Sequence, residues 1–296
     1  MHLHWFSLTL LSAFSLATSD ALGKKFMQGY TAAELVIVRF VGAAVLLAPL
    51  LWERDFPTLP IGFWAWLGIS IPLEILAMLL YMQAVRDGEL SLSLPHLSFT
   101  PVFTVLLGEV VLGEKVSAAG LLGIFLIVLG TFLLHAERHG TLWCRFAAPY
   151  RTLRHNRGVR SMLIVALIYS VTVITTKAAL QYMPGALFGP FYFAVLGVVT
   201  LVLAGVLRPS SLQVLMRRPS LHLLVAGLFA TMVYTHFMAI ERVQAAYMVA
   251  VKRSSILFSV IYGSVLFAEP AFRKRLAAAS LMIAGVALIG LRGGAA

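Results

Sequence analysis

Long apolar stretches separated by short polar breaks run along the whole chain. They fall at about 3–22, 32–51, 63–84, 91–112, 116–135, 161–180, 186–207, 221–240, 245–267 and 276–291. The breaks hold charged and turn-forming residues, among them Lys24-Lys25, Arg86-Asp87-Gly88 and Gly113-Glu114-Lys115. About 20 apolar residues cross the hydrocarbon core as a helix, and a helix satisfies its own backbone hydrogen bonds in lipid. The pattern therefore predicts an all-α membrane protein with ten transmembrane helices.

Composition agrees with this pattern. Of the 296 residues, 60% are apolar and 12% are charged, and the mean hydropathy is +0.92. A soluble domain carries about a quarter charged residues, so these values exclude a soluble enzyme and a disordered chain.

The single cysteine, Cys144, cannot form an intramolecular disulfide. The first apolar stretch lacks the basic start of a signal peptide, and we expect it to be retained as the first crossing.

The chain also repeats itself at an offset of 155 residues, which places 103–133 on 258–288 without a gap. The repeat aligns identical polar and glycine positions, including Gly108 with Gly263, Glu114 with Glu269 and Gly130 with Gly285. Such matches are harder to obtain by chance than matches of Leu or Val. We therefore expect two five-helix halves, 1–135 and 161–296, joined by a basic linker, 136–160. Because five is odd, the second half enters the membrane from the opposite face, as in the inverted repeats of secondary transporters.

Several of these motifs also point to a known family. The first copy runs from Pro95 to Leu134 and contains Thr100-Pro101, Gly108 and Gly113-Glu114. The second contains Lys252-Arg253-Ser254, Gly263, Ala268-Glu269 and Gly285, and Lys24 precedes Arg39-Phe40 by fifteen residues. The chain resembles the EamA-type repeat of the drug/metabolite transporter superfamily over nearly its whole length, the linker excepted. The resemblance implies a ten-helix permease that moves small metabolites, often outward.

The net charge of +11 comes from 23 Lys and Arg against 12 Asp and Glu. In a soluble protein it would suggest nucleic acid; here it is a topology signal, and we expect no nucleic-acid partner. One set of connections carries 15 of the basic residues and the opposite set carries four. Since basic residues gather on the cytoplasmic side, this distribution predicts both termini outside. The resemblance implies termini inside, and the sequence leaves the orientation open.

The linker alternates aromatic and basic residues. Trp143, Phe146, Tyr150 and Leu153 recur every three to four residues, beside several arginines. This spacing fits an interfacial helix against anionic lipid headgroups, although a solvated basic loop is the alternative.

Four charged residues lie deep in the predicted helices: Arg39, Glu74, Lys252 and Arg253. A charge in hydrocarbon costs roughly 2.5–3.5 kcal/mol on insertion scales and usually marks function. Lys252 and Arg253 are adjacent and point in different directions, so at least one should face a central cavity. Arg39 is long enough to reach back to the interface instead. Glu74 has two open roles, ion pairing with a cation or carrying a proton.

Weaker candidates surround these four. We expect Tyr81 and His96 to contact the substrate, with ordinary packing as the alternative for both. Pro95 and Pro101 predict a kink in the fourth helix, which should face its partner, the ninth, across the site.

Acidic and basic residues near the helix ends have structural roles in this interpretation. Glu114 and Glu269 end the fourth and ninth helices and should fix the turn into the next helix by accepting backbone N–H groups. We expect Asp20 and Lys177 to be interfacial anchors.

Together these patterns predict a secondary transporter of a small organic metabolite, amino-acid-like or an organic anion, working by alternating access. We expect an exporter in the plasma or inner membrane. The alternatives are an intramembrane enzyme and a receptor or structural membrane protein. The sequence has no aspartate cluster, H-E-x-x-H or nucleotide-binding loop, so we expect no enzyme activity, no metal and no cofactor.

Small residues also recur four positions apart, at Ala119 with Gly123 and at Ser280 with Ala284. This spacing permits close helix packing, within the chain or in a homodimer.

Overall fold

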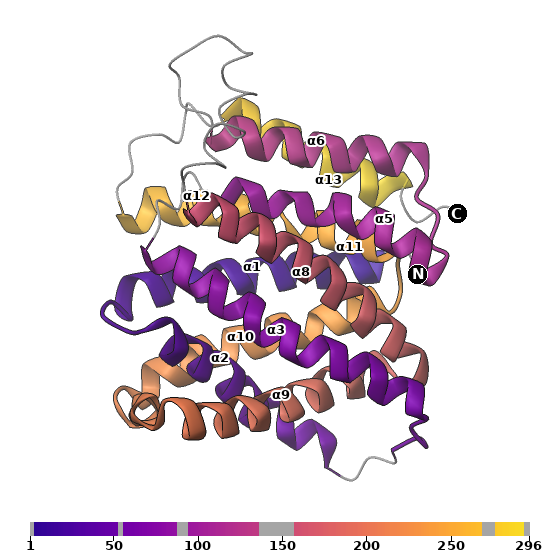
Figure 1. The fold of residues 1–296 in the computed structure, drawn as a ribbon. Coiled ribbons are helices and arrows are strands. Elements are labelled where there is room, and N and C mark those ends of the chain that lie inside the picture. Colours follow the sequence, from indigo (N-terminus) through magenta and orange to yellow (C-terminus); the bar gives the residue numbers. More distant parts are fainter. Residues whose placement is uncertain (1–2, 53–55, 88–93, 136–156, 268–275, 293–296) are drawn as a thin grey trace.

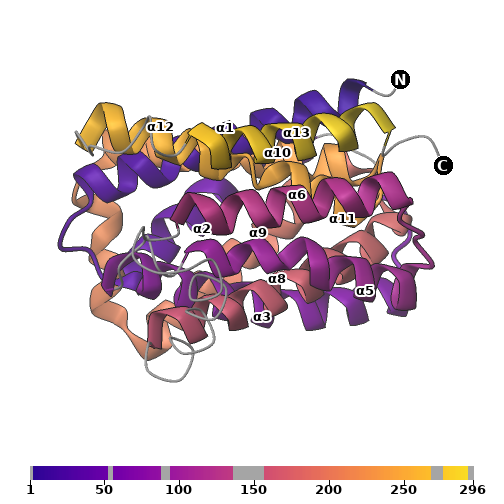
Figure 2. The same cartoon turned by 90° about the horizontal axis from the view of Figure 1, so that it is seen from above.

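The computed structural model describes residues 3–52, 56–87, 94–135, 157–267 and 276–292, and these contain helices and no strand. The first half contains α1 (Leu3–Phe26), α2 (Ala32–Leu47), η1 (Ala48–Leu51), α3 (Ile61–Asp87), η2 (Leu94–Phe99), α5 (Thr100–Leu112) and α6 (Ala118–His135). The second contains α8 (Arg157–Ala179), η3 (Leu180–Tyr182), α9 (Gly185–Leu207), η4 (Pro209–Met216), α10 (Pro219–Ile240), α11 (Ala245–Lys252), α12 (Ser255–Phe267) and α13 (Leu276–Arg292). The helices form an elongated bundle (Figures 1 and 2).

The helix boundaries follow the sequence repeat. α5 begins at Thr100 and ends at Leu112, and α12 begins at Ser255 and ends at Phe267, 155 residues later at both ends. In each half the fourth segment is broken just before this 13-residue helix, after η2 in the first half and after α11 in the second. Most of the expected linker lies outside the described residues, and α8 already begins at Arg157.

The two halves pack mainly against each other. The four most extensive helix–helix contacts join α6 with α13, α3 with α8, α1 with α10 and α2 with α9. In the repeat α1 corresponds to α8, α2 to α9, α3 to α10 and α6 to α13. Exchanging the halves therefore turns the α1–α10 pair into the α8–α3 pair and leaves the α2–α9 and α6–α13 pairs unchanged. The contacts therefore have the pseudo-twofold symmetry that an inverted repeat requires.

The bundle has two ends. We call the end where α1 leads into α2 and η4 joins α9 to α10 the basic face, since it holds Lys24, Lys25, Arg208, Arg217 and Arg218. The opposite end is the distal face, where α2 leads to α3, α5 to α6, α8 to α9 and α10 to α11 (Figure 1).

Five segments are long and apolar enough to cross a membrane: Ala32–Leu51, Ile61–Ala84, Arg160–Tyr182, Gly185–Leu207 and Pro219–Ile240. Three shorter helices are also apolar, His96–Leu112, Ala118–Leu133 and Ala278–Leu291. Side chains on the outside of the bundle, such as Val110, Val206 and Val265, are exposed and apolar, as a lipid-facing surface requires. The structure therefore supports a multi-pass all-α membrane protein, while the count of ten crossings stays a prediction.

Glycines allow α6 and α13 to approach closely (Figure 2). A Cβ atom on Gly285 would lie 2.6 Å from the Gly123 carbonyl oxygen, and one on Gly130 would lie 2.6 Å from the Met282 side chain. In lipid the hydrophobic effect does not drive helices together, and van der Waals packing at close approach stabilises their association instead. Gly123 therefore packs within the chain, whereas Ser280 and Ala284 lie on the exposed side of α13.

This packing predicts the effect of adding one methyl group. We expect Gly285→Ala to destabilise the protein by about 1–3 kcal/mol, because backbone on α6 blocks the new Cβ. Gly68→Ala is the matched control, since nothing lies within 4 Å of a Cβ there. Thermal unfolding in detergent should show a lower midpoint for Gly285→Ala alone. Equal midpoints for both variants would contradict the packing.

Candidate functional site

A cavity of about 130 Å³ lies between the two halves. Its walls come from α1, α2, α3, η2 and α5 of the first half and from α8, α9, α10 and α11 of the second. Its polar lining consists of Arg39, Glu74, Tyr81, Thr100, Tyr169, Thr172, Thr176, Tyr192, His236, Lys252 and Arg253. All four charged residues that the sequence places deep in helices therefore meet in one cavity.

Arg39 is held on one side of this cavity by an ion pair. Its Nη2 lies 2.6 Å from Asp20 Oδ1, and the Tyr81 hydroxyl donates to Asp20 Oδ2 at 3.0 Å. The guanidinium also lies 5.5 Å from the ring centroid of Phe229. Since the Arg39 side chain is only 5% exposed, it does not extend to the interface. The expectation that Asp20 is an interfacial anchor is wrong: its carboxylate turns inward to pair with Arg39.

Lys252 and Glu74 occupy the other side. Lys252 Nζ lies 3.0 Å from His236 Nδ1 and 3.2 Å from Met232 Sδ. Glu74 lies close to Thr172 and attracts Lys252 electrostatically. Among the described residues, neither Lys252 nor Arg253 has a carboxylate oxygen within 4.0 Å, the limit for an ion pair. Positive charge therefore exceeds negative charge in this cavity.

A helix break brings Lys252 and Arg253 to the cavity together. α11 ends at Lys252, Arg253 is its C-cap residue, and α12 starts at Ser255. Adjacent residues within a continuous helix diverge, but the break lets both side chains line the same cavity. The negative end of the α11 dipole also favours cations at this position.

Three buried donors in the cavity have no hydrogen-bond acceptor among the described residues. They are Arg39 Nη1, Arg253 Nε and the Tyr192 hydroxyl. An unsatisfied buried donor costs about 1–3 kcal/mol, so three together suggest that a ligand supplies acceptors. Carboxylate oxygens match this set, since arginine and an ammonium bind them through charge-assisted hydrogen bonds.

The fourth segment of the first half differs in detail from its prediction. Pro101 is in the first turn of α5, where the missing N–H of proline is tolerated. It therefore follows the break between η2 and α5 and does not kink one continuous helix. The side chain of Pro95 lies outside the described residues. His96 is buried with its ring 5.9 Å from that of Phe132 and does not line the cavity, whereas Leu97 and Thr100 do.

A second ion pair joins the halves at the distal face. Glu114 Oε1 pairs with Lys177 Nζ, which also donates to the Val243 carbonyl oxygen, and Glu114 Oε2 accepts from the Ala245 N–H at 2.8 Å. We call these four residues the distal latch. Glu114 thus caps the start of α11, which belongs to the other half. The sequence analysis had predicted that it caps the next helix along the chain. The expectation that Lys177 is an interfacial anchor is wrong, because its side chain is only 16% exposed and is held in this pair. Glu269 lies outside the described residues.

Sequence reasoning missed several lining residues. Among them are Tyr192 and Thr172, which carry no local motif in the sequence. Asp20 could be recognised as the partner of Arg39 only once the arrangement of α1 and α2 in the fold is known.

The Asp20–Arg39 pair predicts a coupled effect on stability. We expect Asp20→Asn and Arg39→Gln each to lower the thermal unfolding midpoint, because each leaves a buried partner unpaired. The double variant should be less destabilised than the sum of the two by about 0.5–3 kcal/mol. Arg39→Gln combined with Glu109→Gln, an exposed and remote carboxylate, should be additive. Additivity in both cycles would show that the ion pair contributes nothing.

Comparison with known proteins adds an independent finding. The profile of the EamA-like transporter family matches residues 3–136 and 156–291. No curated protein matches the chain. Among solved structures 28 chains match, and one of them, titled "Crystal structure of protein", has a TM-score of 0.68 and 16% identity over 98% of this chain and 96% of that one. At this identity the likeness concerns the fold alone.

Proposed function

The chain belongs to the EamA-like transporter family, and we propose that it is a secondary transporter that exports a small organic metabolite by alternating access. The observation that carries the proposal is a charged cavity enclosed between two halves of opposite orientation. In inverted-repeat transporters the substrate site lies at this interface, near the middle of the membrane. The cell membrane is the proposed location.

The substrate class follows from the charges. Lys252, Arg253 and the buried donor of Arg39 offer a carboxylate several hydrogen-bond donors at once. Glu74 stands in the same cavity and can accept from an ammonium group. A cavity of about 130 Å³ fits a small molecule. We therefore propose an amino acid or a closely related zwitterion, with a simple organic anion as the second candidate.

Alternating access requires a closure at each face that can open. At the distal face the halves are joined by the distal latch. At the basic face Arg217, the residue that caps the end of η4, pairs with Glu34 of α2 at 2.9 Å, and the Arg217 side chain is 48% exposed. Solvent screens the exposed Arg217 and weakens its pair, and the attraction within the more buried distal pair is offset by the cost of removing both groups from water. Both pairs can therefore break and re-form during transport. We propose that the two pairs open alternately.

Transport of matched analogues tests the substrate class. In proteoliposome counterflow with a panel of amino acids and organic acids, we expect Lys252→Ala and Arg253→Ala each to reduce uptake of carboxylated substrates by about tenfold or more. One lost charge-assisted hydrogen bond is worth about 1.5–3 kcal/mol. Amino-acid amides, which lack the carboxylate, should be transported poorly by all variants. Lys115→Ala removes an exposed lysine outside the cavity and should leave transport unchanged.

Two results would contradict this proposal. Equal impairment of carboxylated and amide substrates would show that the cations do not recognise an anion. Counterflow of none of the panel by the unaltered protein would reject the proposed substrate class.

The latch has its own test. With Cys144→Ser as the background, a cysteine at Thr176 reports access to the central cavity, which this residue lines. We expect Glu114→Gln to raise the rate at which a membrane-impermeant thiol reagent on the distal face modifies it, by several-fold, because a weaker latch raises the population open to that face. Glu109→Gln is the control, because this exposed glutamate lies in α5, just before the connection that holds Glu114. An unchanged or slower rate with Glu114→Gln would remove the latch from the mechanism.

A further inference from the structure

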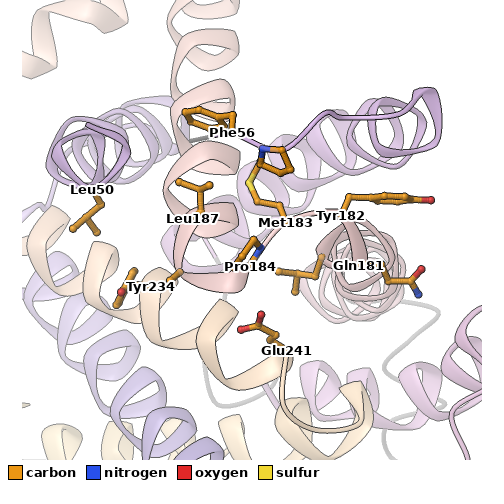
Figure 3. Close-up of a pocket in the computed structure, with 12 residues that line it drawn as sticks. Leu50, Phe56, Gln181, Tyr182, Met183, Pro184, Leu187, Tyr234 and Glu241 are labelled. Atoms are coloured by element: carbon orange, nitrogen blue, oxygen red, sulfur yellow. The ribbon is translucent and has the colours of Figure 1, made fainter. Parts of the chain in front are cut away.

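A second cavity, of about 860 Å³, lies at the distal face, and we call it the vestibule. Three connections of that face contribute to its lining. Phe56 and Pro57 follow η1, residues 181–184 lead from α8 into α9, and Glu241 ends α10 (Figure 3). Most of its walls are therefore built where helices end, at the distal face.

The vestibule and the central cavity lie on opposite sides of one wall, formed by α9 and α10. Tyr234 lines the vestibule, whereas Val233 and Phe237, its neighbours on α10, line the central cavity. Within the wall the rings of Phe188 and Tyr192 stack at 5.7 Å, and Phe237 lies 5.1 Å from Phe188. The vestibule is therefore a separate compartment next to the central site.

Glu241 carries the only charge on the described lining of the vestibule. Figure 3 shows its carboxylate pointing toward the middle of the surrounding residues. No ion pair involves Glu241 in the part of the chain that the structure describes, and its neighbour Arg242 donates to the Met238 carbonyl oxygen instead. A Cβ on Gly185 would lie 2.9 Å from Glu241 Oε2, so the carboxylate lies against the first turn of α9, whose dipole favours the anion.

Apart from Gln181, the other side chains of the lining are apolar or aromatic. Phe56, Tyr182 and Tyr234 contribute rings, and Met183 and Leu187 contribute aliphatic surface. Aromatic faces attract cations, and an unpaired carboxylate beside them gives an ammonium group a counter-ion. The cavity thus suits a ligand with a positive end and an apolar body.

We propose that the vestibule is a second ligand site, which binds small protonated amines with an apolar body and uses Glu241 as their counter-ion. Its charge is opposite in sign to the excess charge of the central cavity, where Arg39, Lys252 and Arg253 outnumber Glu74 and Asp20, the partner of Arg39. A zwitterion leaving the central site would meet a carboxylate selective for its other end. The vestibule site itself does not depend on the transport proposal, since it is defined by its own lining.

Charge-selective cysteine modification tests this site directly. In the Cys144→Ser background, Ala186→Cys places a thiol on the vestibule lining. The purified protein in lipid nanodiscs is treated with a cationic and an anionic methanethiosulfonate, and each rate is normalised to that of a free thiol in solution. We expect the cationic reagent to be favoured by roughly tenfold, as for a unit charge a few ångströms away at intermediate dielectric.

Further variants and a ligand separate charge from shape. Glu241→Gln should abolish the preference, Glu241→Asp should keep most of it, and Glu109→Gln should not change it. The probe 2-phenylethylammonium should slow the modification, and 2-phenylethanol, its neutral analogue, should not.

Three results would overturn the proposal. They are an absence of modification by either reagent, a cationic preference that persists in Glu241→Gln, and equal protection by the alcohol and the ammonium. These results do not depend on whether any substrate is transported, so failure of this site and failure of the transport proposal are distinguishable.

Discussion

Burial of charge inside a bundle with an apolar exterior constrains the whole structure. Arg39, Lys252 and Arg253 line the central cavity, where lipid offers them no compensation. Arg39 pairs with Asp20 inside the first half, and Lys252 contacts His236 inside the second. Two further interactions cross between the halves, since Glu74 attracts Lys252 and the Arg39 guanidinium lies over the Phe229 ring. Packing of the halves therefore adds to the stabilisation that each half gives its own charges.

The same constraint accounts for the irregular parts of the fold. The fourth segment of each half is broken at equivalent positions, before Thr100 and before Ser255. In the second half the break presents two adjacent cations to the cavity, and in the first half Thr100 lines the same space. Non-helical backbone at this depth is tolerated because it is enclosed by protein. The site and the departures from regular helix thus have one origin.

Apolar length and identical residues at a fixed offset are local properties, so they predicted the all-helical fold and its two related halves. The depth of Arg39, Glu74, Lys252 and Arg253 in the apolar stretches marked them as candidates, and the structure brings all four to one cavity. The partners were less predictable, since pairing depends on how each helix is rotated about its axis. A single position separates His96, which packs against Phe132, from Leu97, which lines the cavity. Likewise, Glu114 caps a helix 131 residues away, and no local pattern indicates such a contact.

The central claim is that two copies of one five-helix unit face opposite sides of the membrane around the charged cavity. Phe26 and Gln181 are equivalent in the repeat, 155 residues apart, and both are exposed. Single cysteines at these positions, in a chain without Cys144, can be labelled with an impermeant maleimide added to either side of sealed vesicles. The account predicts that each side labels one position and not the other. Labelling of both cysteines from the same side would contradict it.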